Sequence, residues 1–169
     1  MGDVFNAGDN IFLICRGTIL NPDHILLEGN PTNKTVTLTG PADHDGSGLW
    51  EVVGLGGDKF AFAAIGVGPG DSVFLDGRTI DGSVGLAPST DPPFTGTHWE
   101  AILHRNPLGA ADGTYRFKCL GHISNPDHVF LDGRTIDGSV GLAPSAAPPF
   151  TGTHWEAFIF VLPPGFGKC

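Results

Sequence analysis

The segment VFLDGRTIDGSVGLAPSTDPPFTGTHWEA, residues 73–101, sets the architecture of this chain because it occurs twice. It returns at residues 129–157 with two changes, Thr90 to Ala146 and Asp91 to Ala147. A diverged third copy, ILLEGNPTNKTVTLTGPADHDGSGLWEV, lies upstream at residues 25–52. Hydrophobic residues, glycines and one tryptophan follow in the same order in all three copies, so the chain consists of three repeats.

Each copy is preceded by a further strand-like run, so each repeat holds four short apolar runs between turn residues. We place the repeats at about residues 9–57, 58–111 and 112–169. The runs alternate apolar and polar residues, as strands with one buried face do. With 26 glycines, 14 prolines and few helix-period patterns, the chain is predicted to be all-β. Three such repeats can close into a barrel with a hairpin cap, which predicts a single domain over residues 1–169.

The charge and the apolar pattern exclude several partners. The net charge is −9, with 18 acidic and 9 basic residues and no Lys or Arg cluster, so we expect no nucleic acid partner. No apolar run reaches about 18 residues, so we expect no membrane insertion. The start, MGDVFNAGDN, lacks the basic and apolar regions of a signal peptide. We therefore expect a cytoplasmic protein, or one released without a signal peptide.

The chain carries no recognisable catalytic motif: Gly-x-Ser-x-Gly, a phosphate-binding glycine loop and His-Glu-x-x-His are all missing. We interpret Asp43-His44-Asp45 as a solvated turn and expect neither a metal nor a cofactor. The carboxylates of Asp76 and Asp81 resemble a glycosidase pair, but their duplication in repeat three fits binding better than one catalytic centre. The chain is therefore predicted not to be an enzyme.

The cysteines are too few for a disulfide framework. Cys15 and Cys119 hold equivalent places in IFLIC and YRFKC. We expect both to lie inside the barrel as small apolar residues. Cys169 is terminal and is a candidate free thiol.

Three repeats of about fifty residues, each with four strands and a late tryptophan, resemble a β-trefoil, and in particular the ricin B-type lectin superfamily. That family carries a Gln-x-Trp signature in the fourth strand. The corresponding tripeptides here are Gly48-Leu49-Trp50, Thr97-His98-Trp99 and Thr153-His154-Trp155. The missing glutamine indicates a divergent branch. The resemblance covers residues 9–164 and implies three four-stranded repeats with pseudo-threefold symmetry, sugar binding without catalysis, and tryptophans in the barrel core.

Repeats two and three are nearly identical only from the acidic strand to the tryptophan strand, whereas their first strands and tails differ. A packed core requires apolar volume at set places and does not require identical surface residues. Either both copies keep the same binding site, or this segment alone was duplicated recently. Under the first interpretation the candidate carbohydrate-binding residues are Asp76, Arg78, Asp81, Phe94 and His98 in repeat two, and Asp132, Arg134, Asp137, Phe150 and His154 in repeat three.

The acidic residues and the arginine offer hydrogen bonds to a sugar. The carboxylate of Asp76 could accept bonds from two adjacent hydroxyls, the role that the resemblance implies, or it could order the glycine turn that follows. Arg78 and Asp81 flank the hairpin and could grip several hydroxyls together. Alternatively, they form a salt bridge across the turn. The same alternatives apply to the counterparts in repeat three.

The aromatic residues are candidates for stacking on the sugar. Ricin-type sites carry an aromatic platform where this chain has Ala87 and Ala143. Phe94 and His98 are the available substitutes in repeat two, although Phe94 could plug the space under its loop and His98 could be an ordinary strand residue. Repeat one has Glu28 at the acidic place but keeps neither charge of the Arg-Asp pair. We therefore expect two working sites and a degenerate first one.

The residues leave three function classes open. The first is a multivalent lectin that binds glycans or glycoproteins, with galactose or N-acetylgalactosamine as the leading sugars from the resemblance. Such a protein would act as a hemagglutinin, and it could be a homodimer. The second is a protein-binding trefoil, such as a protease inhibitor that acts through the Pro-rich loop at residues 91–96 or 147–152. A purely structural or cytoskeletal trefoil is a third reading.

Overall fold

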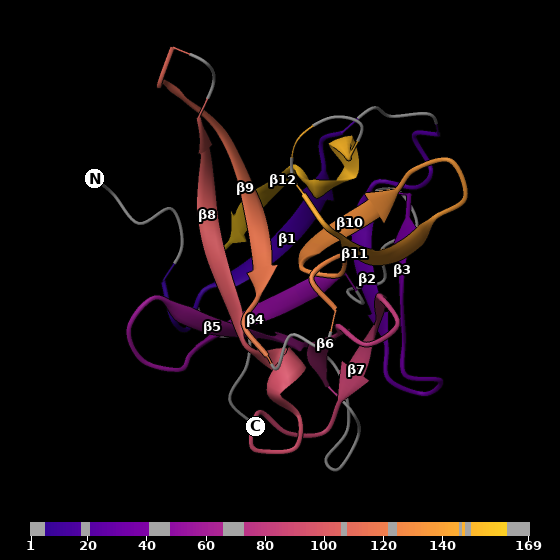
Figure 1. The fold of residues 1–169 in the computed structure, drawn as a ribbon, viewed down its shortest axis with the longest axis vertical. Coiled ribbons are helices and arrows are strands. Elements are labelled where there is room, and N and C mark those ends of the chain that lie inside the picture. The colour runs from indigo at the N-terminus through magenta and orange to yellow at the C-terminus, as the bar shows by residue number, and fades with distance from the viewer. Residues whose placement is uncertain are drawn as a thin grey trace.

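A computed structural model describes residues 6–17, 21–40, 48–65, 73–105, 108–121, 125–145, 147 and 150–161. Within these ranges the chain forms twelve β-strands and two short 3-10 helices (Figure 1), which confirms the all-β prediction. The strands are β1 (Asn10–Cys15), β2 (Leu26–Asn30), β3 (Thr35–Thr39), β4 (Leu49–Gly54), β5 (Lys59–Ala64), β6 (Phe74–Arg78), β7 (Ser83–Ala87), β8 (Trp99–Arg105), β9 (Ala111–Cys119), β10 (Phe130–Arg134), β11 (Ser139–Ala143) and β12 (Trp155–Phe160). The helices are η1 (Thr95–Thr97) and η2 (Thr151–Thr153). No helix in these ranges has the length and apolar character of a membrane span.

Six of these strands close into a ring. Antiparallel pairings join β1 to β4, β4 to β5, β5 to β8, β8 to β9, β9 to β12, and β12 back to β1. The long β8–β9 hairpin is the most prominent part of this ring in Figure 1. Because every strand of the ring has a partner on both sides, the ring leaves no open edge for another chain to pair with.

The remaining six strands form three hairpins, β2–β3, β6–β7 and β10–β11. Each hairpin donates a backbone hydrogen bond to the one before it in a cycle. These bonds run from Leu86 N to Lys34 O, from Leu142 N to Gly82 O and from Leu38 N to Gly138 O, at 3.3, 2.8 and 2.8 Å. The hairpins therefore hold one another together, and each one depends on its neighbour in the next repeat.

The tryptophan of each repeat fills the core. Trp50, Trp99 and Trp155 are fully buried, which confirms that they are core residues. Each indole Nε1 donates to a backbone carbonyl of the second strand in its own repeat, so the one polar atom of the ring is satisfied. The acceptors are the carbonyl oxygens of Leu27, Leu75 and Leu131, at 3.1, 3.0 and 3.0 Å.

A glycine follows the acidic residue of each second strand because the indole ring leaves no room for a side chain. A Cβ at Gly77 would lie 2.9 Å from Trp99 Cη2 and 3.2 Å from Cys119 Sγ. Gly29 and Gly133 face their own tryptophans in the same way, with Cβ distances of 2.8 and 3.0 Å. Packing in the core therefore requires the glycine of each acid-glycine pair, whereas the acidic residue lies toward the surface.

Candidate functional site

Asp76, the middle residue of β6, lines a shallow surface pocket of about 260 Å³. Arg78 and Ile80 line the pocket from the hairpin, and Phe94 and Gly96 line it from the loop that leads into η1. Three of the sequence-predicted residues of repeat two, Asp76, Arg78 and Phe94, therefore meet at one place.

The loop before η1 folds over the acidic residue. Phe94 N donates to Asp91 O at 2.9 Å, and Thr97 Oγ1 donates to Phe94 O at 2.7 Å. These bonds bring Gly96 against β6, where a Cβ would overlap both Gly77 O and Asp76 Oδ1. Only a glycine allows this close approach, which leaves Asp76 9% exposed.

Repeat three builds the same arrangement around Asp132. Thr153 Oγ1 donates to Phe150 O at 2.7 Å, and a Cβ at Gly152 would lie 2.5 Å from Asp132 Oδ1. The alternation of apolar and polar residues along β10 places Asp132 on the face opposite Leu131. The residue lies on that face, but η2 covers it, and its exposed fraction is 8%.

Burial and a nearby arginine act on these carboxylates in opposite directions. Burial raises the pKa of Asp76, and the charge of Arg78 lowers it by a smaller amount, so the pKa stays above its ordinary value of 3.8. Burial likewise raises the pKa of Asp132, against the charge of Arg134. The arginine Nε atoms lie 3.5 and 3.8 Å from the carboxylate Oδ2 atoms. These distances exceed the usual 2.7–3.2 Å of a hydrogen bond, so the carboxylates keep capacity to accept further bonds.

Asp81 and Asp137 cap the hairpin turns. Asp81 Oδ1 accepts bonds from Ser83 N at 2.9 Å and Ser83 Oγ at 2.7 Å, and Asp137 does the same with Ser139. The side-chain bond from the serine is the main reason that the pKa of each carboxyl is lowered. Asn33 caps the turn of repeat one in the same way through Thr35. Arg78 lies beside Asp76, so the salt bridge to Asp81 that the sequence suggested is replaced by a pair within β6.

The two histidines before the tryptophan strands do not join the acidic residues. His98 Nε2 lies 2.8 Å from Thr90 O, and His98 is not among the residues that line the Asp76 pocket. His154 Nδ1 lies 3.1 Å from Thr151 O, and its ring meets His104 edge-on with centroids 4.5 Å apart. Sequence identity between the repeats thus did not produce identical surroundings for these side chains.

A histidine from the next repeat covers each charged hairpin, a contact that the sequence analysis missed. His128 Nδ1 lies 3.0 Å from Thr79 O, and His24 Nδ1 lies 3.1 Å from Thr135 O. Both histidines end the motif Asn-Pro-Asp-His, at residues 21–24 and 125–128, and the repeat of this motif was the available signal. The two DGRTIDG hairpins therefore share a structural neighbour, which gives a second reason for their identity.

The two buried cysteines lie beneath the two acidic residues. Cys119 Sγ is 3.6 Å from Gly96 O and 3.7 Å from Gly77 O, and Cys15 Sγ lies at the same distances from Gly152 O and Gly133 O. Burial raises the pKa of Cys15 to about 11 and also raises that of Cys119. Both thiols stay protonated at neutral pH and act as small packing groups, as expected. Cys169 lies outside the described residues.

In the described part of the chain, no group of three or more His, Cys, Asp or Glu side chains is placed to hold a metal ion. The segment Asp43-His44-Asp45 lies outside that part.

The fold is shared with solved structures of low sequence identity. One is SeviL bound to asialo-GM1 saccharide, with a TM-score of 0.62 and 13% identity over 89% of this chain and 97% of that one. Another is the BEL beta-trefoil in apo crystal form 3, with a TM-score of 0.63 and 15% identity over 94% of this chain and 97% of that one. No family model and no curated protein matches the chain. The similarity is therefore one of fold.

Proposed function

We propose that the chain is a non-catalytic β-trefoil lectin of a divergent ricin B-like type, with two near-equivalent sugar sites in repeats two and three. The observation that carries this proposal is the Asp76 carboxylate, which is buried in a surface pocket beside Arg78 and Phe94. Asp132 and Arg134 repeat its surroundings. The threefold recurrence of strand order, tryptophan and glycine supports the trefoil, and the fold shared with saccharide-bound SeviL supports sugar binding.

Each site offers the groups that a sugar ring requires. An ionised carboxylate accepts bonds from two adjacent hydroxyls, and the exposed guanidinium of Arg78 donates to others. Phe94 and the exposed tip residue Ile80 offer apolar surface for the C–H face of a sugar. The pocket is smaller than the 300–1,000 Å³ that is typical for drug-sized ligands, so we expect it to hold one terminal sugar. Galactose and N-acetylgalactosamine are the sugars we propose to test first, on glycans or glycoproteins.

Repeat one lacks the features that carry the proposal. Asn30 and Asn33 replace the arginine and the turn-capping acid, and Asn30 Oδ1 is engaged by Thr32 N and Asn33 N within the turn. Ala64 stands near Gly29, where the other repeats have a cysteine thiol. Glu28 keeps only the acidic group, so we propose that repeat one does not bind sugar.

The protease-inhibitor alternative rests on the loop at residues 91–96, where Asp91, Pro92 and Pro93 are exposed. The second half of this loop is held against β6 by Gly96, which leaves a short exposed segment. A reactive loop of this kind would act once in each inhibitor, whereas the chain carries two copies. This alternative is tested with a protease panel beside the sugar experiment.

Calorimetric titration with galactose and N-acetylgalactosamine tests the proposal. We expect two equivalent sites in the native chain, one in Asp76→Asn or Asp132→Asn, and none in the double variant, because an amide accepts fewer bonds than a carboxylate. The matched control is Asp81→Asn with Asp137→Asn, which makes the same chemical change in the same hairpins and keeps the turn cap that Asn33 provides in repeat one. No binding to any glycan at millimolar concentration, together with inhibition of a protease, would refute the lectin.

A further inference from the structure

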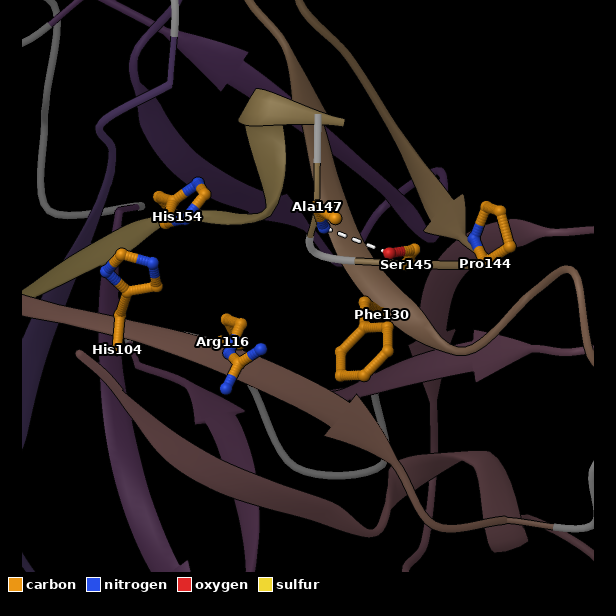
Figure 2. A pocket seen from close by; sticks show the side chains of 7 residues that line it. All are labelled: His104, Arg116, Phe130, Pro144, Ser145, Ala147 and His154. Carbon is orange, nitrogen blue, oxygen red and sulfur yellow. Dashed lines mark hydrogen bonds between the residues drawn. The ribbon is translucent and has the colours of Figure 1, made fainter. Parts of the chain in front are cut away.

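A second pocket, of about 570 Å³, opens between repeats two and three. His104 from β8, Arg116 from β9 and Phe130 from β10 form one side of it (Figure 2). The other side consists of Pro144, Ser145 and Ala147, which follow β11, and of His154 just before β12. Neither Asp132 nor Arg134 lines this pocket, so it is distinct from the proposed sugar site of repeat three.

The side chains of this pocket favour a negative charge. The lining includes one guanidinium and two imidazoles and no acidic residue, although the chain as a whole has a net charge of −9. Figure 2 shows the Arg116 guanidinium directed into the space between His104 and Phe130. Its Nε is buried and has no hydrogen-bond partner among the residues that the structure describes. Buried donors without an acceptor are rare because they are costly, so the Arg116 side chain would gain from an acceptor in the pocket that its guanidinium lines.

One of the two positions at which the duplicated segments differ lies in this pocket. Ala147 lines it, whereas repeat two has Asp91 at the equivalent position. One contact is the same in both loops: Ala147 N donates to Ser145 Oγ at 3.0 Å, and Asp91 N donates to Ser89 Oγ at 2.9 Å. The change from acid to alanine therefore removes a negative charge from the wall and keeps this contact.

The counterpart of this pocket in repeat two lacks its cation. Arg116 of β9 lies opposite Ile102 of β8, three residues after Trp99. At the equivalent position of the β4–β5 pair, opposite Val53, repeat two has Ala61. His98 also turns toward the loop carbonyl of Thr90, whereas His154 meets His104. The cationic pocket therefore distinguishes repeat three from repeat two, in contrast to the proposed sugar sites, which are duplicated.

We propose that this pocket binds a carboxylate carried on a six-membered ring. Arginine binds carboxylates through two parallel hydrogen bonds, and the imidazoles of His104 and His154 lie beside it as further donors. The ring of the ligand packs against Phe130 and Pro144. The pocket volume lies within the range of about 300–1,000 Å³ that is typical for small-molecule sites. This site does not depend on Asp76 or Asp132 and stands whether or not those residues bind a neutral sugar.

Two pairs of probes test the site by calorimetry or ligand-observed NMR. Glucuronate against glucose represents an acidic sugar, and benzoate against benzyl alcohol represents an aromatic acid. Each pair differs at the carboxylate and keeps the ring. We expect at least one acid to bind one site per chain at least tenfold more tightly than its neutral partner, and the pair that responds identifies the source of the carboxylate.

Three variants locate that binding. Arg116→Met removes the cation, and Ala147→Asp restores the acid of repeat two, so each is expected to weaken acid binding by about tenfold or more. Asp91→Ala, the reciprocal change in repeat two, is the matched control and leaves binding unchanged. If Arg116→Met does not fold, Ala147→Asp still decides, because repeat two carries Asp91 at the equivalent position with the same backbone contact to a serine hydroxyl. Equal binding of acids and neutral partners, or native affinity in Ala147→Asp, would overturn the proposal. Asp132→Asn separates the two sites, since it removes sugar binding in repeat three and leaves acid binding intact.

Discussion

At the scale of single residues, the burial of Asp76 and Asp132 opposes the ionised form on which the proposed sugar sites depend. Taking a carboxylate out of water disfavours its charged form, and burial is the main cause of the raised pKa at both positions. The neighbouring arginines lie too far from Oδ2 to offset this fully. Hydroxyl groups of a bound sugar would add donors to the one that Arg78 offers Asp76. A site that is destabilised when empty is a common property of binding proteins.

The raised pKa of Asp76 predicts a pH-dependent gain in stability for Asp76→Asn. Between the ordinary value of 3.8 and the higher folded pKa, the folded state keeps a proton that the unfolded state has lost. The contribution of Asp76 to stability therefore falls as the pH rises through this window. We expect Asp76→Asn to gain free energy of unfolding relative to the native chain between about pH 3 and pH 7, measured by urea unfolding.

Asp81→Asn is expected to change the free energy of unfolding with pH in the opposite direction. The pKa of Asp81 is lowered by its bonds to Ser83, so its contribution is complete above 3.8 and is lost as the pH falls. This variant should lose stability relative to the native chain as the pH rises. Parallel pH profiles for the two variants would contradict the assignment of one carboxylate to a buried site and the other to a turn cap.

At Gly77, packing of the core restricts which residue can follow Asp76. A Cβ at this position would lie 2.9 Å from the Trp99 ring and 3.2 Å from Cys119 Sγ. We expect Gly77→Ala to lower the free energy of unfolding by about 1–3 kcal/mol, the usual cost of overpacking a well-packed core. Adding Cys119→Ala should recover part of the loss in a double-mutant cycle. An unchanged midpoint in denaturant would show that the strand can move away from the indole ring.

At the scale of elements, the four strands of each repeat were predictable because alternation, turn residues and the tryptophan are local signals. The surroundings of Asp132 were not, because η2 covers a face that alternation places toward solvent. Arg78 and Asp81 were grouped together because they are neighbours in sequence, yet the strand directs Arg78 toward Asp76 and the turn engages Asp81 with Ser83. Local patterns predict strands, whereas loop packing and hydrogen bonding decide the contacts of the site.

Each charged hairpin is held by an element of the following repeat, which predicts a cross-repeat effect on binding. His128→Ala removes the contact to Thr79 O, and we expect the β6–β7 hairpin to open more often and sugar affinity at Asp76 to fall by a few fold. Hydrogen exchange of the hairpin amides and titration in an Asp132→Asn background measure the two effects.

His24→Ala is the reciprocal control, because His24 contacts the hairpin of repeat three through Thr135 O. It should weaken binding at Asp132 in an Asp76→Asn background and leave the β6–β7 amides unchanged. If His128→Ala weakened the Asp132 site more than the Asp76 site, the proposed coupling from each repeat to the preceding one would be wrong.

At the scale of the whole molecule, the duplicated segment indicates which features repeats two and three have in common, and the structure shows the features in which they differ. Arg116 and His104 lie in β9 and β8, outside the identical block, so no comparison of the copies could select them. The sequence shows that Ala147 replaces Asp91 in repeat three. The effect of this change on the charge of the pocket depends on Arg116 and His104, which lie on the strands that face it. The threefold plan is therefore encoded in the repeats, whereas the differences between the sites arise where one repeat packs against the next.

The two proposed sugar sites, on the β6–β7 and β10–β11 hairpins, predict cross-linking, which is a property of the intact molecule. Linking two sites converts the second binding step into an intramolecular one and raises the avidity for surfaces that carry many glycans. We expect the native chain to agglutinate glycoprotein-coated beads, and Asp76→Asn and Asp132→Asn each to bind the beads without agglutinating them. A homodimer would alter this result, because each single-site variant would still present two sites per particle. Sedimentation analysis of the same samples therefore decides the interpretation: agglutination by a monomeric single-site variant would contradict the two-site proposal, and agglutination by a dimeric one would assign the second site to the partner copy.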